Sequence, residues 1–357
     1  MKTIFLSFSI ADSSVSDYFI ELSNRLSKEF EVIIITDHQD KDVLHISPEI
    51  KIFKWPSRRP TKWKDFIFLK EKVRQFKPEM MISIFGAVNL FLLTGFLLRI
   101  KHRIAWIRTI SSQFPGSKSL HLRKKYVYKL ATKIFANSKA TKLDLVEKFG
   151  VQDTKVEVIY NAVKKPVVGT TKVNRQKIIY VGRMHASKGV RTLIEAMHLV
   201  LIEFPDIKLS IIGGDLEGKE IENLRNRAEE LEISESIFFT GNHSKQRVLE
   251  EFSEAYLTVV PSIVEAFGFV VIESFSVKTP VIGSKTSGIA EIIRDGKDGF
   301  LFEPENSQDL ASKIIKMLKD ARLRDVMSES CHKHFLEEFE VEKSTRKLAA
   351  KISDLVN

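Results

Sequence analysis

Two glutamates separated by seven residues stand out in the segment that runs from Pro261 to Glu273. Glu265 precedes Gly268, at which a helix is predicted to begin, and Glu273 lies five residues into that helix. Backbone N–H groups at a helix N-terminus carry partial positive charge and bind phosphate. Glu273 would lie roughly 7.5 Å further along the helix axis, which suits ribose hydroxyls. The alternative for each glutamate is a solvated surface carboxylate, although both have apolar neighbours.

A second segment, from Tyr180 to Gly189, places Arg183 and Lys188 in the loop after a predicted strand. A guanidinium contacts phosphate oxygens in pairs and an ammonium acts as a point charge, so the two can converge on one diphosphate. Exposed cations are the alternative, above all for Lys188. Two cations and a helix terminus sum to roughly +2.5 charges, which is comparable with a divalent cation. We therefore expect a site without a metal ion or other cofactor.

Short β-rich runs alternate with longer helical segments along the whole chain, the pattern of parallel sheets covered by helices on both faces. The sequence predicts an α/β protein of two doubly wound domains, residues 1–162 and 177–339, joined by a linker at 163–176. A last helix at 340–357 could pack on either domain. Ligands of such sheets bind at the carboxyl ends of the strands, where both segments lie.

Together the two segments resemble the donor site of the family-4 retaining glycosyltransferases, which have the GT-B fold of two Rossmann-like domains facing across a cleft. The resemblance covers 178–215, 239–305 and 136–161, whereas residues 1–130 share only the order of strands and helices. It implies transfer of a sugar from a nucleotide diphosphate sugar, with UDP favoured over GDP, and with retention of configuration. It also implies a saccharide or lipid-linked acceptor and a role in cell-envelope or exopolysaccharide synthesis.

The resemblance implies a role for each matching residue. Arg183 and Lys188 would bind the diphosphate and, with Glu265, form the catalytic group, while Glu273 would bind the ribose. Further substrate contacts are implied for Gly182, for the backbone of Phe267, Gly268 and Phe269, and for Asn242 and His243 beside the base. The first domain lacks the family's usual glycine-rich loop and its usual His or Asp, so no acceptor-side residue is assigned.

Charge is distributed unevenly along the chain. The formal net charge is +10, and the segment from Arg99 to Lys142 contains twelve basic residues and no acidic one. Such a segment indicates an anionic neighbour: a phosphorylated substrate, a membrane surface or a nucleic acid. No nucleic-acid-reading module accompanies it, so we expect no nucleic-acid partner. An anionic membrane and an ordinary solvated surface remain open.

The cell compartment is predicted from cysteine usage and hydrophobic runs. Cys331 is the only cysteine, so no disulfide is expected and a cytoplasmic location is favoured. The N-terminal apolar run is too short for a signal peptide. Residues 80–98 carry no charge, but polar and glycine residues interrupt them, which predicts a buried strand and a packed helix rather than a membrane span.

Two other functions fit parts of the pattern. A nucleotide-sugar epimerase or phosphorylase has the same fold and uses related substrates, and a non-catalytic sensor, membrane-binding or nucleic-acid-binding protein needs only a binding surface. Asp40 and Asp42 match an Asp-x-Asp metal motif superficially and indicate a solvated turn. Transfer is favoured because the paired glutamates are typical of transferases.

Overall fold

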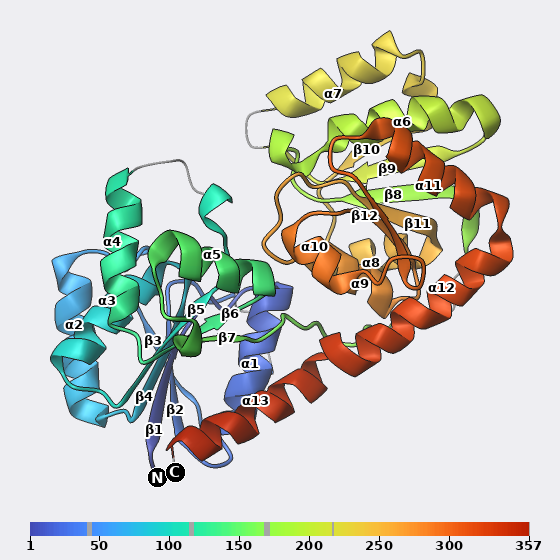
Figure 1. Cartoon of the computed structure of the whole chain (residues 1–357). Coiled ribbons are helices and arrows are strands. Elements are labelled where there is room, and N and C mark those ends of the chain that lie inside the picture. The colour runs from blue at the N-terminus through green and yellow to red at the C-terminus, as the bar shows by residue number, and fades with distance from the viewer. Residues whose placement is uncertain (41–44, 114–117, 168–171, 216–217, 357) are drawn as a thin grey trace. The chain divides into compact units, whose positions relative to one another are not determined.

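The structure is a computed structural model that describes residues 1–40, 45–113, 118–167, 172–215 and 218–356. The chain divides into two compact units, Met1–Lys164 with Glu340–Asn357, and Lys165–Phe339. Each unit is an α/β domain built on one parallel sheet (Figure 1). Of the Asp-x-Asp motif, Asp40 is described and contacts His38, while Asp42 lies outside the described residues.

The first unit has a seven-stranded sheet in the order β3-β2-β1-β4-β5-β6-β7. Its strands are β1 (Thr3–Ser7), β2 (Glu31–Thr36), β3 (Lys51–Lys54), β4 (Met80–Ile84), β5 (His102–Ile107), β6 (Lys133–Ala136) and β7 (Val156–Val158). Its helices are α1 (Ser14–Leu26), α2 (Trp63–Phe76), α3 (Val88–Leu97), α4 (Lys118–Lys129), α5 (Lys139–Phe149) and α13 (Val341–Val356).

Alternate residues of these strands point to opposite faces of the sheet, and each face has its own core. On β1, Ile4 and Leu6 pack with residues of α1 and α13, whereas Phe5 packs with residues of α2 and α3. The helix that follows the second unit in the sequence therefore completes the first. The hydroxyl groups of Tyr18 and Ser344 lie 3.1 Å apart between α1 and α13.

The second unit has a six-stranded parallel sheet in the order β10-β9-β8-β11-β12-β13. Its strands are β8 (Asn174–Val181), β9 (Lys208–Ile212), β10 (Ile237–Gly241), β11 (Ala255–Val260), β12 (Val281–Ser284) and β13 (Gly299–Phe302). Its helices are α6 (Val190–Glu203), α7 (Lys219–Glu230), α8 (Lys245–Glu254), α9 (Phe269–Ser276), α10 (Ser287–Ile292), α11 (Ser307–Lys319) and α12 (Ala321–His334), the last continued by a π-helical turn, Phe335–Phe339.

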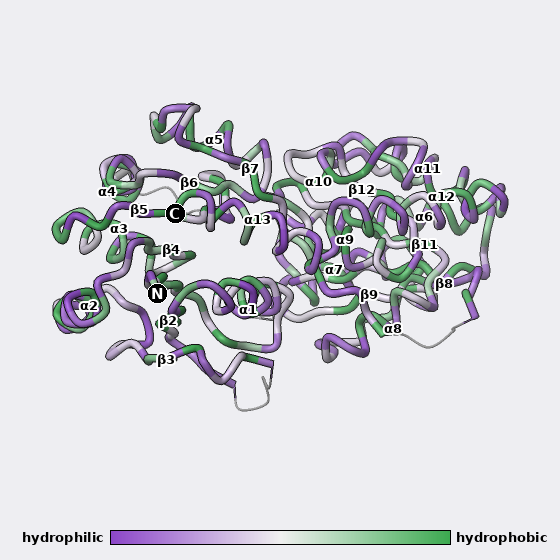
Figure 2. The backbone as a smooth tube through the Cα atoms, turned by 90° about the horizontal axis from the view of Figure 1, so that it is seen from below, coloured by the Kyte–Doolittle hydropathy of each residue, from purple (hydrophilic) through white to green (hydrophobic). Residues whose placement is uncertain are grey.

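Most helices alternate between hydrophobic and hydrophilic residues, as helices with one buried side do (Figure 2). The uncharged run 80–98 forms β4, a short turn and α3, which confirms the strand and helix predicted there. Within the described ranges, no helix is both long enough and apolar enough to span a bilayer. β8 begins at Asn174, so the last three residues of the expected linker belong to a strand.

Candidate functional site

The centre of the second sheet contains a change in strand order. The chain leaves β8 for β9 on one side and later enters β11 on the other side of β8. In an open parallel sheet such a switch point opens a crevice at the carboxyl ends of the two central strands, where ligands bind. The loops that follow β8 and β11 meet there, because the amide of Ile263 donates to the carbonyl of Ser187 at 2.9 Å.

Lys188 and Glu265 form an ion pair across these two loops. The ammonium Nζ of Lys188 lies 2.6 Å from Oε2 of Glu265, and the two side chains are 17% and 18% exposed. This distance is that of a strong, charge-assisted hydrogen bond. The structure therefore brings together two residues that lie 77 positions apart and that the sequence assigned to one site.

At Gly189 the backbone of the loop after β8 lies so close to the loop after β11 that no side chain fits there. This residue has φ +66°, and a Cβ atom there would lie 2.0 Å from the carbonyl oxygen of Pro261. Glycine is the residue that tolerates both the left-handed conformation and the close approach. The position of Lys188 beside Glu265 therefore depends on its glycine neighbour.

Arg183 lies near the start of the loop after β8, whereas Lys188 lies near its end, and the side chain of Arg183 is exposed. The hydroxyl of Tyr180 donates to the carbonyl of Arg183 at 3.1 Å, and burial together with the Glu265 charge raises the pKa of Tyr180. Among the residues that the structure describes, none forms an ion pair with the Arg183 guanidinium. Arg183 lines a pocket of about 380 Å³ together with Met184, His185, Ala186, Gly214, Asp215, Lys219 and Glu220. Neither Lys188 nor Glu265 lines this pocket.

Asn242 and His243 follow β10, and Asn242 lies next to the loop that follows β9. A Cβ atom at Gly214 would lie 2.8 Å from Nδ2 of Asn242, so the amide of Asn242 packs against this pocket-lining glycine. Nδ1 of His243 is buried and has no hydrogen-bond partner in the described parts of the chain. Gly182 is tied to the same region, since its amide donates to the carbonyl of Ile212 at the end of β9.

The helix α9 begins as predicted, with Gly268 as its N-cap at φ +107°. Phe267 does not present its side chain to a ligand, because the ring is 1% exposed and contacts the ring of Phe269 at a centroid distance of 5.9 Å. Phe267 can therefore offer only its backbone at the helix start, whereas the side chain of Phe269 is half-buried. Glu273 is the fifth residue of α9, the position in the helix that the sequence predicted. Its side chain is half-buried.

Residues at the start of α10 form hydrogen bonds with the loop before α9. The carbonyl of Glu265 accepts a hydrogen bond from the amide of Gly288 at 3.1 Å. The hydroxyl of Thr286 donates to the carbonyl of Ile263 at 3.0 Å. These bonds fix the backbone at Ile263 and Glu265, and a fixed backbone limits the positions that the Glu265 carboxylate can adopt.

The loop that follows β9, Gly213-Gly214-Asp215, belongs to this region but was not predicted from the sequence. Asp215 and Lys219 line the same pocket as Arg183, and the amide of Met184 donates to the carbonyl of Gly214 at 2.9 Å. The signal in the sequence was a pair of glycines and a carboxylate directly after a buried strand. That is the position of a ligand-binding loop in a parallel sheet.

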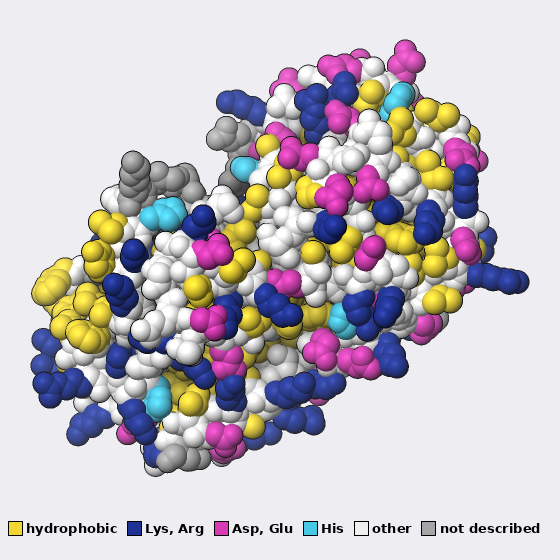
Figure 3. All heavy atoms as spheres, in the orientation of Figure 1, with side chains coloured by type: hydrophobic (Ala, Val, Ile, Leu, Met, Phe, Trp, Pro, Cys, Tyr) yellow, Lys and Arg dark blue, Asp and Glu magenta, His cyan; other side chains and the backbone are white. Residues whose placement is uncertain are grey.

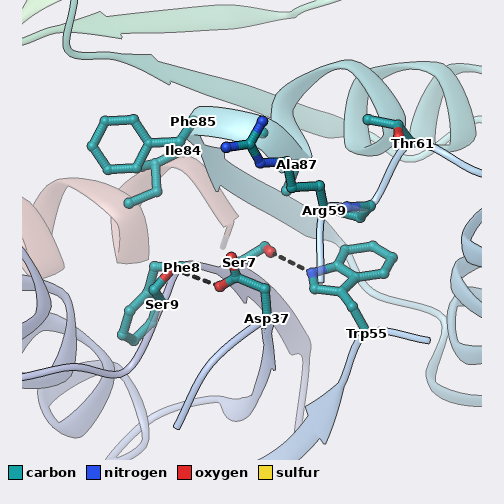
Figure 4. A pocket seen from close by; sticks show the side chains of 12 residues that line it. Ser7, Phe8, Ser9, Asp37, Trp55, Arg59, Thr61, Ile84, Phe85 and Ala87 are labelled. Atoms are coloured by element: carbon teal, nitrogen blue, oxygen red, sulfur yellow. Dashed lines mark hydrogen bonds between the residues drawn. The ribbon is translucent and has the colours of Figure 1, made fainter. Parts of the chain in front are cut away.

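The first unit contains a pocket of about 370 Å³ that was not predicted from the sequence. It lies at the carboxyl ends of β1, β2 and β4, again where the strand order changes. Asp37 and Arg59 line it, with the ring of Phe85 at its edge (Figure 4). Ser9 donates to Asp37 at 2.5 Å, and the indole of Trp55 donates to Ser7 at 3.2 Å. This pocket therefore offers charged and aromatic groups side by side.

The histidines of the first unit are not part of this pocket. The imidazole of His121 stacks on the ring of Phe149 at 5.5 Å. Burial lowers the pKa of His102, which is the first residue of β5. Neither residue lines the first-unit pocket.

The basic residues between Arg99 and Lys142 do not form one continuous charged surface. Arg108 is buried, and burial lowers its pKa to about 10. Arg103 donates to the carbonyls of Leu130 and Ile100. Ion pairs hold Lys133 and Lys142 to Glu157 and Asp153. Exposed cations are left on α4 and in the turn after α3, while residues 114–117 lie outside the described ranges.

In the ranges that the structure describes, no group of three or more His, Cys, Asp or Glu side chains is arranged to hold a metal ion. The charged groups around the second switch point include the ion pair of Lys188 and Glu265, and Arg183 shares its pocket with Asp215, Lys219 and Glu220. Such a set can bind an anion and its hydroxylated neighbour.

Comparison with known proteins identifies the family. Residues 164–334 match the model of glycosyl transferases group 1, and residues 15–165 match that of Glycosyltransferase Family 4. A glycosyltransferase of Methanocaldococcus jannaschii is 31% identical over 273 residues, which cover 73% of this chain and 72% of that protein. One of Haemophilus influenzae is 26% identical over 318 residues, covering 87% and 88%. Both are described as uncharacterized. The chain belongs to the group 1, family-4 glycosyltransferases.

Solved structures agree with the fold. HepE from Anabaena, solved in complex with UDP, superposes with a TM-score of 0.80 at 18% identity and covers 99% of this chain and 100% of its own. The protein therefore has the GT-B fold, as the resemblance implied, and its family membership makes it a glycosyltransferase.

Proposed function

We propose that the protein is a retaining hexosyltransferase that uses a uridine diphosphate sugar as donor. The observation that carries this proposal is the contact between Lys188 and Glu265 at the switch point of the second sheet, beside the start of α9. HepE, which shares the fold, is described in complexes with UDP, with UDP and glucose, and with UDP-glucose. These complexes support a uridine nucleotide as the donor for this chain.

In this proposal the donor lies across the carboxyl ends of β8, β9 and β11. Arg183 and Lys188 bind the diphosphate, and Glu273 accepts hydrogen bonds from the ribose hydroxyls. Glu265 and the backbone amides at Gly268 and Phe269 contact the transferred sugar and the phosphates, while Asn242 and His243 border the base. Arg183 lines a pocket large enough for part of a nucleotide.

Catalysis would be mainly electrostatic. As the bond between the anomeric carbon and the phosphate oxygen lengthens, negative charge grows on the diphosphate, where the two cations and the α9 terminus already lie. Before donor binding, the Glu265 carboxylate offsets one of these charges through its contact with Lys188. A bound diphosphate would compete for that ammonium and release Glu265 to accept a sugar hydroxyl.

Retention requires the acceptor to attack the same face that the diphosphate leaves. The acceptor oxygen forms its bond to the anomeric carbon as the phosphate bond breaks, and the departing phosphate oxygen takes the acceptor's proton. This route needs no side-chain nucleophile and no metal ion. The group formed by Lys188, Glu265 and Arg183 suits it, because it binds charge rather than supplying a base.

The acceptor that we propose is a saccharide, free or lipid-linked, in cell-envelope or exopolysaccharide synthesis. The first-unit pocket supports a polar, ring-shaped acceptor because Asp37 and Arg59 offer hydrogen bonds and Phe85 offers an aromatic face. We further propose that the protein acts in the cytoplasm, attached to an anionic membrane surface through its basic first unit. The surplus of Lys and Arg in the first half of the chain supports this attachment.

The donor site is tested by Arg183→Ala and Glu273→Ala. Each change removes hydrogen bonds to a charged group, so we expect the free energy of UDP binding and of the transition state to weaken by about 1.5–3 kcal/mol. Isothermal titration with UDP and the rate of UDP release from UDP-sugars with a saccharide acceptor measure the two effects. Arg191→Ala, on the exposed side of α6, is the matched control.

The outcomes separate the proposal from its alternatives. A transferase releases UDP in proportion to added acceptor, and chelation with EDTA leaves that rate unchanged. An epimerase would convert the sugar and keep the nucleotide attached, and a sensor would bind UDP without turnover. Unchanged UDP binding in both Arg183→Ala and Glu273→Ala would place the donor elsewhere.

A further inference from the structure

The helix α3 of the first unit is apolar on its outer side as well as on its inner side. Leu93, Phe96 and Leu97 recur at a spacing of three and four residues, so they form one stripe along the helix. Their side chains are between 42% and 55% exposed. The opposite side, with Phe91 and Leu92, is buried in the core. A helix that is apolar all round is ordinarily buried, and this one is covered on one side only.

The apolar stripe extends onto both neighbouring helices. α3 packs against α2 and against α4 on the same side of the sheet. Each neighbour presents an exposed apolar pair one turn apart, Trp63 and Ile67 on α2 and Leu122 and Tyr126 on α4. We refer to these seven residues, three on α3 and two on each neighbour, as the apolar face. Hydrophobic side chains gather over these helices in the space-filling view, with Lys and Arg side chains beside them (Figure 3).

Cations surround the apolar face. The described side chains of α4 include four Lys or Arg residues and no carboxylate, and Arg99 and Lys101 follow α3. α2 contains four basic residues and two acidic ones, of which Asp65 is buried. The ammonium of Lys129 lies 5.4 Å from the ring centroid of Tyr126, so charge and aromatic surface are adjacent. An exposed apolar patch of this kind marks an interaction site, and the cations at its border favour an anionic partner.

We propose that the apolar face docks on an anionic lipid bilayer, with its apolar side chains entering the boundary between headgroups and acyl chains. Lys and Arg at the border then contact lipid phosphates, as at other interfacial protein surfaces. A second copy of the chain fits less well, because a symmetric contact would bring the cations of both copies together. This inference rests on the membrane attachment proposed above and adds the part of the surface that enters the lipid.

The test uses the full chain and vesicles of phosphatidylcholine with or without phosphatidylglycerol. Co-sedimentation should require the anionic lipid and should weaken with salt. Trp63 is 73% exposed, whereas Trp55 and Trp106 are 7% and 1% exposed. The intrinsic emission should therefore shift to the blue on binding, and Trp63→Phe should abolish the shift. The double substitution Phe96→Asp with Leu97→Asp should weaken vesicle binding by about tenfold or more.

Matched controls are Ile202→Asp on α6 and Val326→Asp on α12, which place the same charge at exposed apolar residues of the second unit. Vesicle binding that is absent, or that survives the Phe96 and Leu97 substitutions, would overturn the inference. So would an equal loss in the two controls. A dimer in analytical ultracentrifugation that these substitutions dissociate would assign the face to a second copy instead. UDP titration of the same variants reports separately on the donor site, which should be unchanged.

Discussion

At the scale of single residues, the contact between Lys188 and Glu265 links the two segments that the sequence had singled out separately. Residue types and local spacing were sufficient to select both side chains. The sequence could not show that they touch before a ligand binds, because that contact depends on the order of strands in the sheet. Nor could it show that the Phe267 side chain belongs to the core and only its backbone to the site.

Gly189 is predicted to be the residue on which this geometry depends. In Gly189→Ala the left-handed backbone is strained and the new Cβ meets the carbonyl of Pro261, so we expect a loss of about 3 kcal/mol in the free energy of unfolding. Gly296→Ala is the matched control, since its φ is +74° and nothing lies within 4 Å of its Cβ position. The control should lose only about 1 kcal/mol. Urea denaturation measures both, and equal losses would contradict the prediction.

At the scale of elements, most strands were predictable because they are short apolar runs, and those at the centre of each sheet, such as β1 and β11, are buried on both faces. The start of β8 was placed too late because Asn174, Arg175 and Gln176 are polar and exposed, so nothing in their hydropathy marks a strand. The pockets at the strand ends were not predictable, since their walls come from loops far apart in the chain. Asp37 and Arg59, for instance, follow different strands and share one pocket.

A buried carboxylate joins the loop before β13 to α12. Asp298 accepts hydrogen bonds from Arg294 at 2.6 and 2.7 Å, from Ser330 at 2.9 Å and from His334 at 2.8 Å. Burial alone would raise the pKa of Asp298, but these hydrogen bonds outweigh burial and hold the pKa well below its ordinary value of 3.8. The charged form is therefore favoured in the folded protein.

This lowered pKa predicts a pH dependence of stability. The stabilisation by Asp298 is complete above the unfolded-state pKa of 3.8 and is lost as the pH falls below it. Asp298→Asn should lower the free energy of unfolding by about 2 kcal/mol at pH 7. The difference from the unaltered protein should shrink in urea titrations below about pH 4. Asp325→Asn changes an exposed carboxylate on α12 and should show no such dependence.

At the scale of the whole molecule, α13 was the element whose place the sequence left open between the two domains. The structure packs it on α1, where Leu348 and Ile352 join the core of the first unit. The amphipathic pattern of α13 predicted a buried side, but it could not indicate which unit buries it. That choice is made by partners over 300 positions away, such as Arg25, which donates to Thr345 at 2.9 Å.

Leu348→Ala should destabilise the first unit alone. Removing a buried leucine costs about 2–5 kcal/mol, so amide hydrogen exchange should accelerate in β1 and α1 and remain unchanged in β8 and β11. Lys347→Ala, at an exposed position of the same helix, should leave exchange in all four elements unaltered. Faster exchange in β8 or β11 would contradict the division of the chain into two units.

The position of α13 also affects how the protein is made. During translation the strands β1 to β7 leave the ribosome first, yet the hydrophobic surface that α13 covers stays open until residue 356 has emerged. All segments of the unit formed by Lys165–Phe339 are synthesised before α13. The amino-terminal unit would thus be the last to mature, and for the whole synthesis of the second it would depend on chaperones to shield its unfinished core.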